Sequence, residues 1–576
     1  MSRLSMPRLR VSGYAVALLF VLAVAFALRV WGAKHGLPYA FNADENAHFV
    51  TRAIGMFVTG GDPEYYVNPA AYTNVLHIVF SVWFGGREGV SETFASHPGE
   101  VFLVARVTAA ALGTVAIWLL YLAGKRLFDA RTGLLAAALL AVSFLPVFYS
   151  HLALNDVPTL APIALSLWGT AGILREGRVR DYVIAGLGLG IASATKYTGG
   201  IVLLPLIAAA LVQFTAPGGR NAAARGLVIA GVFSLVGFVG ANPYALLEFE
   251  KFKEGLSHQS DAADDALGKL GLTHDNGLAY YLWTFTWGMG WIPLIAATVG
   301  AILLLRDEPR LLAILAPAPI LFILFMGSQA RFFGRWLIPV FPLMALLAAY
   351  CIFELADSLG RRRPALRLTA MVVGVVALCG QGLVYSLHIG QVLSREDTRN
   401  AAREWMVANV PERTKIVVEP IVPDGWASDV GMPSLATANG YRWVKYAASR
   451  SLIDPDTGQP VPEPGIVINI EDYERILRPS LVDDYEEGGY CWVVTGSTQR
   501  GRAEVEPEVV PEALAYYREL ERRGDVVYEV SPFDQGADPV EFNFDFSFDY
   551  YPLAYRRPGP LITVYRLRGG ACTGVS

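Results

Sequence analysis

The sequence contains 576 residues, of which 53% are hydrophobic and only 17% are charged, and its mean hydropathy is +0.38. Soluble globular proteins average about a quarter charged residues, so this composition excludes an ordinary soluble protein and indicates long apolar segments that cross a membrane. The charge is also uneven, since residues 392–576 carry 19 basic and 30 acidic side chains. This acidic half argues against nucleic-acid binding, which requires a basic surface.

Apolar segments in the first two-thirds of the chain predict eleven transmembrane helices. We interpret the first as a retained helix, because it lacks a convincing small-residue cleavage site. Residues 70–85 are apolar and aromatic but short for a span, so we expect a helix that lies at the membrane interface. The predicted spans are residues 11–31, 101–123, 133–149, 155–174, 181–195, 198–214, 224–241, 281–304, 311–327, 335–356 and 367–389.

The positive-inside rule gives an orientation. With a cytoplasmic N-terminus, the predicted inner segments contain seventeen Lys and Arg residues and the short outer turns contain three. Counting residues 70–85 as a further span would place most of the seventeen outside. We therefore expect a multi-pass protein of the cell membrane with a long first outer loop (33–100) that holds interfacial helices. The odd number of spans places the C-terminal half outside.

The predicted fold class is a polytopic α-helical membrane domain of about 11 transmembrane helices (1–391) followed by an extracytoplasmic, soluble mixed α/β domain (392–576). In the second domain, helices are predicted at 397–409 and 511–522, and strands at 416–419, 491–495, 526–530 and 562–567. Cys491 lies in a strand and Cys572 just past the last one. Because the domain is placed in an oxidising compartment, we expect a disulfide between them.

Two adjacent carboxylates, Asp44 and Glu45, stand in the first outer loop shortly after the first span. A carboxylate held in a partly dry cleft can deprotonate a hydroxyl nucleophile. The structural alternative is capping, because Asn42 or Asp44 would be a good N-cap for an interfacial helix that runs to Phe57. As like charges, Asp44 and Glu45 are expected to raise one another's pKa where both are poorly solvated.

The other outer turns add one carboxylate and three cations. Asp156 precedes Pro158 at the start of a helix, where capping is again the alternative. Lys196 occupies a tight turn between two apolar segments, where it either snorkels to water or binds an anion. Arg331 and Arg335 share a later turn, and guanidinium groups suit phosphate. Together these groups fit a reaction that activates a hydroxyl and releases a phosphate.

Several stretches of the first 350 residues form a known pattern. They are the Asp44-Glu45 pair in a long first outer loop, Arg106 in the second span, Lys125-Arg-Leu-Phe-Asp-Ala-Arg-Thr-Gly133, residues 151–158, residues 186–199 with Thr195-Lys-Tyr, and Arg335-Trp-Leu-Ile-Pro-Val-Phe-Pro342. In this pattern the sequence resembles the GT-C glycosyltransferases, specifically the branch of the protein O-mannosyltransferases and the aminoarabinose lipid A transferase. The C-terminal domain resembles outer-face domains appended to some bacterial members.

The resemblance implies an inverting transfer of a hexose or pentose from a polyprenyl-phosphate carrier to an acceptor hydroxyl. This is the chemistry of protein or lipid glycosylation in the cell envelope. It implies that Asp44 is the catalytic base, that Glu45 and Asp156 shape the site or hold the sugar, and that cations bind the departing phosphate. The expected catalytic residues are Asp44 and Glu45, and the expected substrate-binding and donor-binding residues are Asp156, Lys196, Arg331, Arg335 and Arg106.

The expected partners are the membrane, the polyprenyl-phosphate sugar donor, and an acceptor that is a lipid, a polysaccharide or a protein. No cofactor is expected to be required; the alternative is a divalent metal site formed by His48 and His151 with the nearby carboxylates. The alternative function is a transporter or flippase of a lipid-linked sugar. Transporters usually carry ionisable groups deep within their spans, and here the centres of the spans are nearly free of them.

Overall fold

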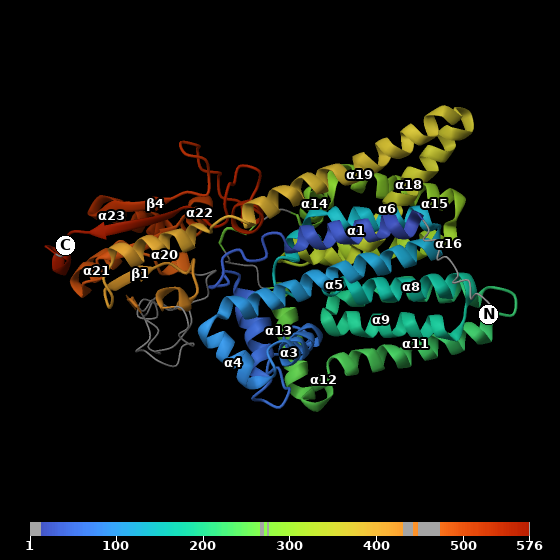
Figure 1. Ribbon diagram of the computed structural model, residues 1–576, viewed down its shortest axis with the longest axis horizontal. Coiled ribbons are helices and arrows are strands. Elements are labelled where there is room, and N and C mark those ends of the chain that lie inside the picture. Colours follow the sequence, from blue (N-terminus) through green and yellow to red (C-terminus); the bar gives the residue numbers. More distant parts are fainter. Residues whose placement is uncertain (1–12, 265–269, 273–275, 430–441, 447–472, 575–576) are drawn as a thin grey trace, which may run out of the picture.

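The computed structural model describes residues 13–264, 270–272, 276–429, 442–446 and 473–574. A bundle of helices is followed by a domain built on one β-sheet, and α19 (Pro364–Leu393) leads from the bundle to α20 (Thr398–Asn409), the first helix of the sheet domain (Figure 1). The other bundle helices are α1 (Gly13–Val30), α5 (Pro98–Leu127), α6 (Ala130–Val142), α7 (Phe144–Tyr149), α8 (Leu160–Glu176), α9 (Val179–Thr195), α10 (Leu203–Phe214), α11 (Arg220–Ala241), α14 (Gly277–Phe285), α15 (Trp291–Asp307), α16 (Pro309–Leu315), α17 (Pro317–Gly327) and α18 (Phe341–Arg362).

Eight helical segments in the described ranges are long and apolar enough to cross a membrane. They coincide with the predicted spans at α1, α5, α10, α11, α14 with α15, α16 with α17, α18 and α19. The other three predictions fall on α6 with α7, on α8 and on α9, which are shorter helices of 13, 6, 17 and 17 residues. The multi-pass helical class is confirmed, and the count of eleven stays a prediction.

The loop between α1 and α5 contains helices of its own, namely η1 (Glu45–Val50), α2 (Thr51–Gly55), α3 (Ala71–Trp83) and α4 (Arg87–Ser96). α3 covers the segment that we expected at the membrane interface. Its side chains Ile78, Val82 and Trp83 are largely exposed, which suits a helix whose apolar face enters the headgroup region. Two further loop helices, α12 (Tyr244–Leu247) and α13 (Phe249–Asp264), follow α11.

Ion pairs join loops that we predict to be cytoplasmic. Arg126, at the end of α5, binds Asp181 at the start of α9 with 2.8 Å between Nη1 and Oδ1. Arg131 and Arg367 share the Asp357 carboxylate near the end of α18. These contacts gather the connections after α5, α8 and α18 at one end of the bundle. The side of the membrane that this end faces stays a prediction.

The C-terminal domain contains a five-stranded sheet in the order β2-β1-β3-β5-β4. Strand β1 (Lys415–Val418) is parallel to β2 (Val444–Lys445) and to β3 (Trp492–Gly496), whereas β5 (Ile562–Leu567) is antiparallel to β3 and to β4 (Gly524–Val530). In the register, Val417 lies opposite Val493 and Val494 lies opposite Val564. The four strands predicted from the sequence are confirmed as β1, β3, β4 and β5.

Helices cover both faces of this sheet. Because side chains alternate along a strand, Ile416 and Val494 face α20, whereas Val417 and Val493 face α21 (Ser480–Gly488) and α23 (Pro511–Arg523). A further helix, α22 (Ser497–Val505), follows β3 directly. The predicted helices at 397–409 and 511–522 are confirmed as α20 and α23, and Asp397 caps α20 by accepting from the Arg399 N–H. The predicted Cys491–Cys572 disulfide is present.

The segment of residues 543–551 reaches from the sheet domain into the bundle. The hydroxyl oxygens of Tyr550 and Tyr149 lie 3.0 Å apart, and the Tyr550 ring contacts Trp287 with 4.7 Å between centroids. Tyr280 donates a hydrogen bond to Asp545 over 2.7 Å. All of these side chains are buried, so the two parts of the chain are packed together around the region described next.

Candidate active site

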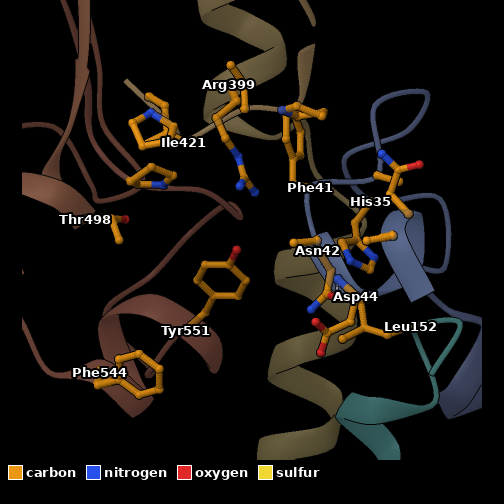
Figure 2. Close-up of a pocket in the computed structure, with 18 of the residues that line it drawn as sticks. His35, Phe41, Asn42, Asp44, Leu152, Arg399, Ile421, Thr498, Phe544 and Tyr551 are labelled. Atoms are coloured by element: carbon orange, nitrogen blue, oxygen red, sulfur yellow. Dashed lines mark hydrogen bonds between the residues drawn. The ribbon is translucent and has the colours of Figure 1, made fainter. Parts of the chain in front are cut away.

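A cavity of about 460 Å³ lies where the bundle meets the sheet domain. The bundle contributes residues 40–44, 46 and 47 after α1, residues 148, 149 and 152 at and after the end of α7, and Arg331, Phe333 and Arg335 before and within η4 (Gly334–Val340). The sheet domain contributes Arg399 of α20, residues 420–423 after β1, the start of α22, and Phe544, Tyr551 and Pro560. Figure 2 shows Asn42 and Asp44 on one wall and Ile421, Thr498 and Tyr551 on the opposite one.

Asp44 stands at the N-terminus of η1, but its side chain does not cap that helix. The cap is Asn42, whose Oδ1 accepts hydrogen bonds from the N–H groups of Asp44 (3.1 Å) and Glu45 (3.3 Å). The Asp44 carboxylate is therefore available for other contacts, and it accepts from Arg335 Nη1 over 2.8 Å. The capping alternative thus applies to Asn42, and Asp44 lines the cavity with about a third of its side chain exposed.

The charge of Asp44 is set by its partners. Burial tends to raise the pKa of this carboxyl, but Arg335, followed by His48, outweighs burial, so the pKa of Asp44 lies below its ordinary value. The expectation that Glu45 would raise it is wrong, because the Glu45 carboxylate is bound by another arginine. Burial in turn lowers the pKa of His48 despite Asp44 at 3.7 Å, so His48 is neutral near pH 7.

Glu45 lies behind this wall and does not line the cavity. Its carboxylate accepts from Arg106 at both oxygens, over 2.7 and 2.8 Å, and from the N–H of Ala153 over 2.8 Å. Arg106 also donates to the carbonyl oxygens of Ala33 and His35. The exposed fractions of the Glu45 and Arg106 side chains are 0% and 1%. The Arg106 guanidinium is thus occupied by protein acceptors, which favours a positioning role over the donor binding that the sequence suggested.

Asp156 and Lys196 form an ion pair between the turns after α7 and α9. Asn155 supports the same junction by donating to the carbonyl of Thr195 over 2.8 Å. Burial lowers the pKa of the Lys196 amine, and Asp156 opposes this effect. Neither residue of the pair lines the cavity, yet Lys196 interacts electrostatically with Asp44 and Arg335. The pair therefore adds to the electrostatic surroundings of the site from behind its wall.

Arg331 and Arg335 both line the cavity. Their guanidinium carbons lie 4.8 and 5.3 Å from the centroid of the Phe333 ring, a cation–π arrangement that holds two cations on one aromatic side chain. The structure thus brings Asp44, Arg331 and Arg335, which the sequence placed on one face of the membrane, into one cavity. Such a cluster can hold a phosphate beside a carboxylate.

The two histidines proposed as metal ligands make separate contacts with other groups of the protein. His151 is fully buried, with Nε2 2.9 Å from the carbonyl oxygen of Trp31 and Nδ1 3.2 Å from that of Phe148. His48 stacks on Tyr65 with 4.6 Å between ring centroids. Within the described ranges, no group of three or more His, Cys, Asp or Glu side chains is arranged to hold a metal ion.

The wall from the sheet domain was not anticipated from the sequence. It includes Arg399, which is bound by Asp397 and stacks on Phe41 with 3.7 Å from the guanidinium carbon to the ring centroid. It also includes Thr498 and Gln499 of α22. One signal was present: Gly496-Ser497-Thr498 directly follows a predicted strand, and open α/β sheets bind ligands beyond the carboxyl ends of their parallel strands.

Comparison with known proteins supports the GT-C class that the sequence predicted. Residues 93–241 match the family model of dolichyl-phosphate-mannose-protein mannosyltransferases. Apo ArnT from Cupriavidus metallidurans is 14% identical, with 98% of this chain and 100% of that chain covered and a TM-score of 0.51. The apo oligosaccharyltransferase of Archaeoglobus fulgidus is also 14% identical, with 94% and 76% covered and a TM-score of 0.50. No curated protein matches the sequence.

The chain is thus a multi-pass membrane protein with the fold of the GT-C glycosyltransferases, which confirms the class that the sequence predicted. ArnT has also been solved with undecaprenyl phosphate bound, and that structure is 14% identical, covers 97% of this chain and 99% of that chain, and has a TM-score of 0.47.

Proposed function

We propose that this protein is a membrane glycosyltransferase that transfers a sugar from a polyprenyl-phosphate donor to an acceptor hydroxyl, with inversion at the anomeric carbon. The observation that carries the proposal is the Asp44 carboxylate held against Arg335 in a cavity at one end of the helical bundle. The family match over residues 93–241 and the GT-C fold support a lipid-phosphate donor. The same relatives do not favour the transporter alternative.

The proposed reaction uses Asp44 as the general base. The acceptor hydroxyl loses its proton to the Asp44 carboxylate while its oxygen attacks the anomeric carbon. The bond between that carbon and the phosphate oxygen breaks, and the polyprenyl phosphate leaves with the electron pair. Arg331 and Arg335 stabilise the negative charge that develops on the leaving phosphate, with Lys196 adding to the positive field.

The Asp44–Arg335 pair also explains how a weakly basic carboxylate can act as a general base. Without a donor, Arg335 lowers the pKa of Asp44. A donor phosphate competes for the same guanidinium, and its arrival leaves the partly buried carboxylate with less stabilisation of its charge. The pKa of Asp44 then rises, which strengthens the base at the moment when both substrates are in place.

We propose that the reaction takes place on the outer face of the membrane, because the bias of basic residues places the loops of the site there. We further propose that no metal ion is required, since Arg331, Arg335 and Lys196 supply the positive charge that a leaving phosphate needs. Turnover that persists in EDTA and does not rise with added Mg²⁺ or Mn²⁺ would support this; turnover that depends on an added ion would contradict it.

The decisive experiment is a donor screen with the purified full-length protein in lipid nanodiscs. Undecaprenyl-phosphate and dolichyl-phosphate carriers loaded with hexoses or pentoses are incubated with lipid, glycan and peptide acceptors, and release of the free polyprenyl phosphate is measured. We expect release from at least one donor, with an inverted anomeric configuration in the product. A folded protein that releases no polyprenyl phosphate from any donor would refute the proposal.

A further inference from the structure

The start of α22 faces the cavity from the side opposite Asp44. Strands β1 and β3 are parallel neighbours, so their carboxyl ends lie at the same edge of the sheet. The residues that follow them, 420–423 after β1 and Thr498 and Gln499 after β3, all line the cavity. A crevice beyond the carboxyl ends of parallel strands is the common ligand site of open α/β sheets. Here that crevice opens into the proposed active site.

Gln499 is the unusual side chain of this wall. It is fully buried, and neither its Oε1 nor its Nε2 has a hydrogen-bond partner among the described residues. Nearly all buried polar groups are hydrogen-bonded, and an unpaired amide is costly. Gln381 in the bundle shows the usual arrangement, since it donates to the carbonyl of Thr286 and accepts from the N–H of Trp291. Gln499 instead lines a cavity, where a ligand could supply both missing partners.

The backbone around Gln499 offers further donors. The first N–H groups of a helix have no partner within the helix. The Gly496 N–H is taken by Glu419 and the Ser497 N–H by the carbonyl of Leu561. Gly496 provides no capping side chain, and the first turn contains no acidic residue. The N–H groups of Thr498 and Gln499 therefore have no acceptor among the described residues, and the Thr498 hydroxyl also lines the cavity.

These groups select for one chemistry. The Oε1 atom of Gln499 needs a donor, which a phosphate dianion or a carboxylate cannot provide, because both only accept hydrogen bonds at neutral pH. A hydroxyl group both donates and accepts, and it suits the Gln499 amide in either orientation. The same cavity presents the aromatic rings of Phe544 and Tyr551, which suit the apolar face of a sugar ring.

We propose that Thr498, Gln499 and the N-terminus of α22 form a subsite for a hydroxylated sugar ring. This inference rests on the proposed function, because it places the ring in the cavity where transfer would take place. The ring belongs either to the donor or to the acceptor. In both cases the sheet domain takes a direct part in selecting the sugar.

The test uses Gln499→Met, which keeps the length of the side chain and removes both polar atoms, and Thr498→Val as a second variant. Gln381→Met is the matched control, a glutamine whose amide is bonded and which does not line the cavity. Each full-length protein is placed in nanodiscs. Binding is measured for undecaprenyl phosphate, for undecaprenyl-phosphate mannose and arabinose, and, by saturation-transfer NMR, for a panel of methyl glycosides and short peptides.

We expect Gln499→Met to unfold at the same or a higher temperature, because an unpaired buried amide is lost, whereas Gln381→Met unfolds at a lower one. Weaker binding of the sugar-loaded carrier by about tenfold, with the bare carrier unaffected, would assign the subsite to the donor sugar. Weaker binding of a methyl glycoside by about tenfold, with both carriers unaffected, would assign it to the acceptor sugar. Loss of one or two neutral hydrogen bonds gives an effect of this size.

Unchanged binding in every arm, binding of peptides in place of glycosides, or lower thermal stability of Gln499→Met would each overturn the subsite. A different result would refute the proposed function. If the wild-type protein binds glycosides through Gln499 but releases no polyprenyl phosphate from any donor, the subsite stands and the transferase proposal falls. If the wild-type protein releases polyprenyl phosphate and Gln499→Met binds every ligand as the wild type does, the transferase proposal stands and the subsite falls.

Discussion

Asp44 is the residue on which the proposed chemistry depends most directly. Asn42 caps η1, so Asp44→Asn removes the charge without removing a cap. We expect the thermal stability to change little and turnover to fall by roughly a hundredfold or more, the usual contribution of a general base. Release of polyprenyl phosphate from the donor found in the screen measures this. Full activity of Asp44→Asn would show that another group takes the proton.

The pH profile gives an independent test at the same residue. Because the pKa of Asp44 lies below its ordinary value, its basic form is present at neutral pH and is lost only as the pH falls through that low value. Arg335→Gln removes the partner and leaves burial, which raises the pKa. We therefore expect the acidic limb of the kcat/KM profile to move to higher pH in Arg335→Gln. Arg331→Gln, which lacks the contact with Asp44, should weaken donor binding without moving that limb.

The sequence could place these side chains near one another only through topology. The charges of the loops predicted that Asp44, Arg331 and Arg335 share one end of the bundle, and the structure brings all three to one cavity. The sequence could not predict which arginine each carboxylate would bind. Asp44 and Glu45 are adjacent in the chain, but one binds Arg335 and the other Arg106, because successive residues of a helical turn point in different directions.

At the scale of elements, the Glu45–Arg106 pair fastens η1 to α5 and to the turn after α7. Both side chains are fully buried, so Glu45→Gln leaves the Arg106 guanidinium without a counter-charge and should cost about 3–5 kcal/mol in the free energy of unfolding. The double variant Glu45→Leu, Arg106→Met leaves no such charge and should be more stable than the single variant. Thermal unfolding of the wild type, Glu45→Gln and the double variant measures this, and a double variant that is less stable than Glu45→Gln would contradict the clamp.

The same clamp explains a second expected result. Since Glu45 positions the segment that carries Asp44, the double variant should bind the donor with little change but turn over more slowly than wild type, because the base is less well held. A catalytic role for the Glu45 carboxylate predicts instead that turnover is lost wherever this carboxylate is removed, in the double variant as in Glu45→Gln. Measuring kcat and donor affinity side by side separates the two roles.

Apolar periodicity predicted the elements whose apolar side chains repeat along the chain. It did not predict α22, which lines the side of the cavity that the sheet domain forms. Strands β1, β3 and β5 and helices α20 and α23 were found because each buries a regular set of side chains. Strand β4 was found from its β-branched and aromatic residues, although none of its side chains is buried. Helix α22 reads Ser-Thr-Gln-Arg-Gly-Arg-Ala-Glu-Val and has no apolar stripe, so only its position after β3 marks it. Thr498 and Gln499 were missed for this physical reason.

At the scale of the whole molecule, the orientation in the membrane is the main open prediction. A fluorescent protein that matures only in the cytoplasm, fused after Ser576, should remain dark. The same reporter inserted after Arg363, in a loop predicted to be cytoplasmic, is the matched control and should be bright. The Cys491–Cys572 disulfide agrees with an oxidising compartment. A bright fusion after Ser576 would reverse the orientation and place the site on the cytoplasmic side.

The division of the cavity between the helical bundle and the sheet domain has a consequence for divergence. The Asp44 carboxylate, Arg331 and Arg335 come from the bundle, whereas Arg399, residues 420–423 and the start of α22 come from the sheet domain. Mutations in the sheet domain can therefore accumulate and change the recognised molecule while the inherited chemistry is retained. A recombination junction after Leu393 would exchange one whole wall at once, together with residues 543–551, whose contacts with Tyr149 and Tyr280 set which pairs of parents yield a folded hybrid.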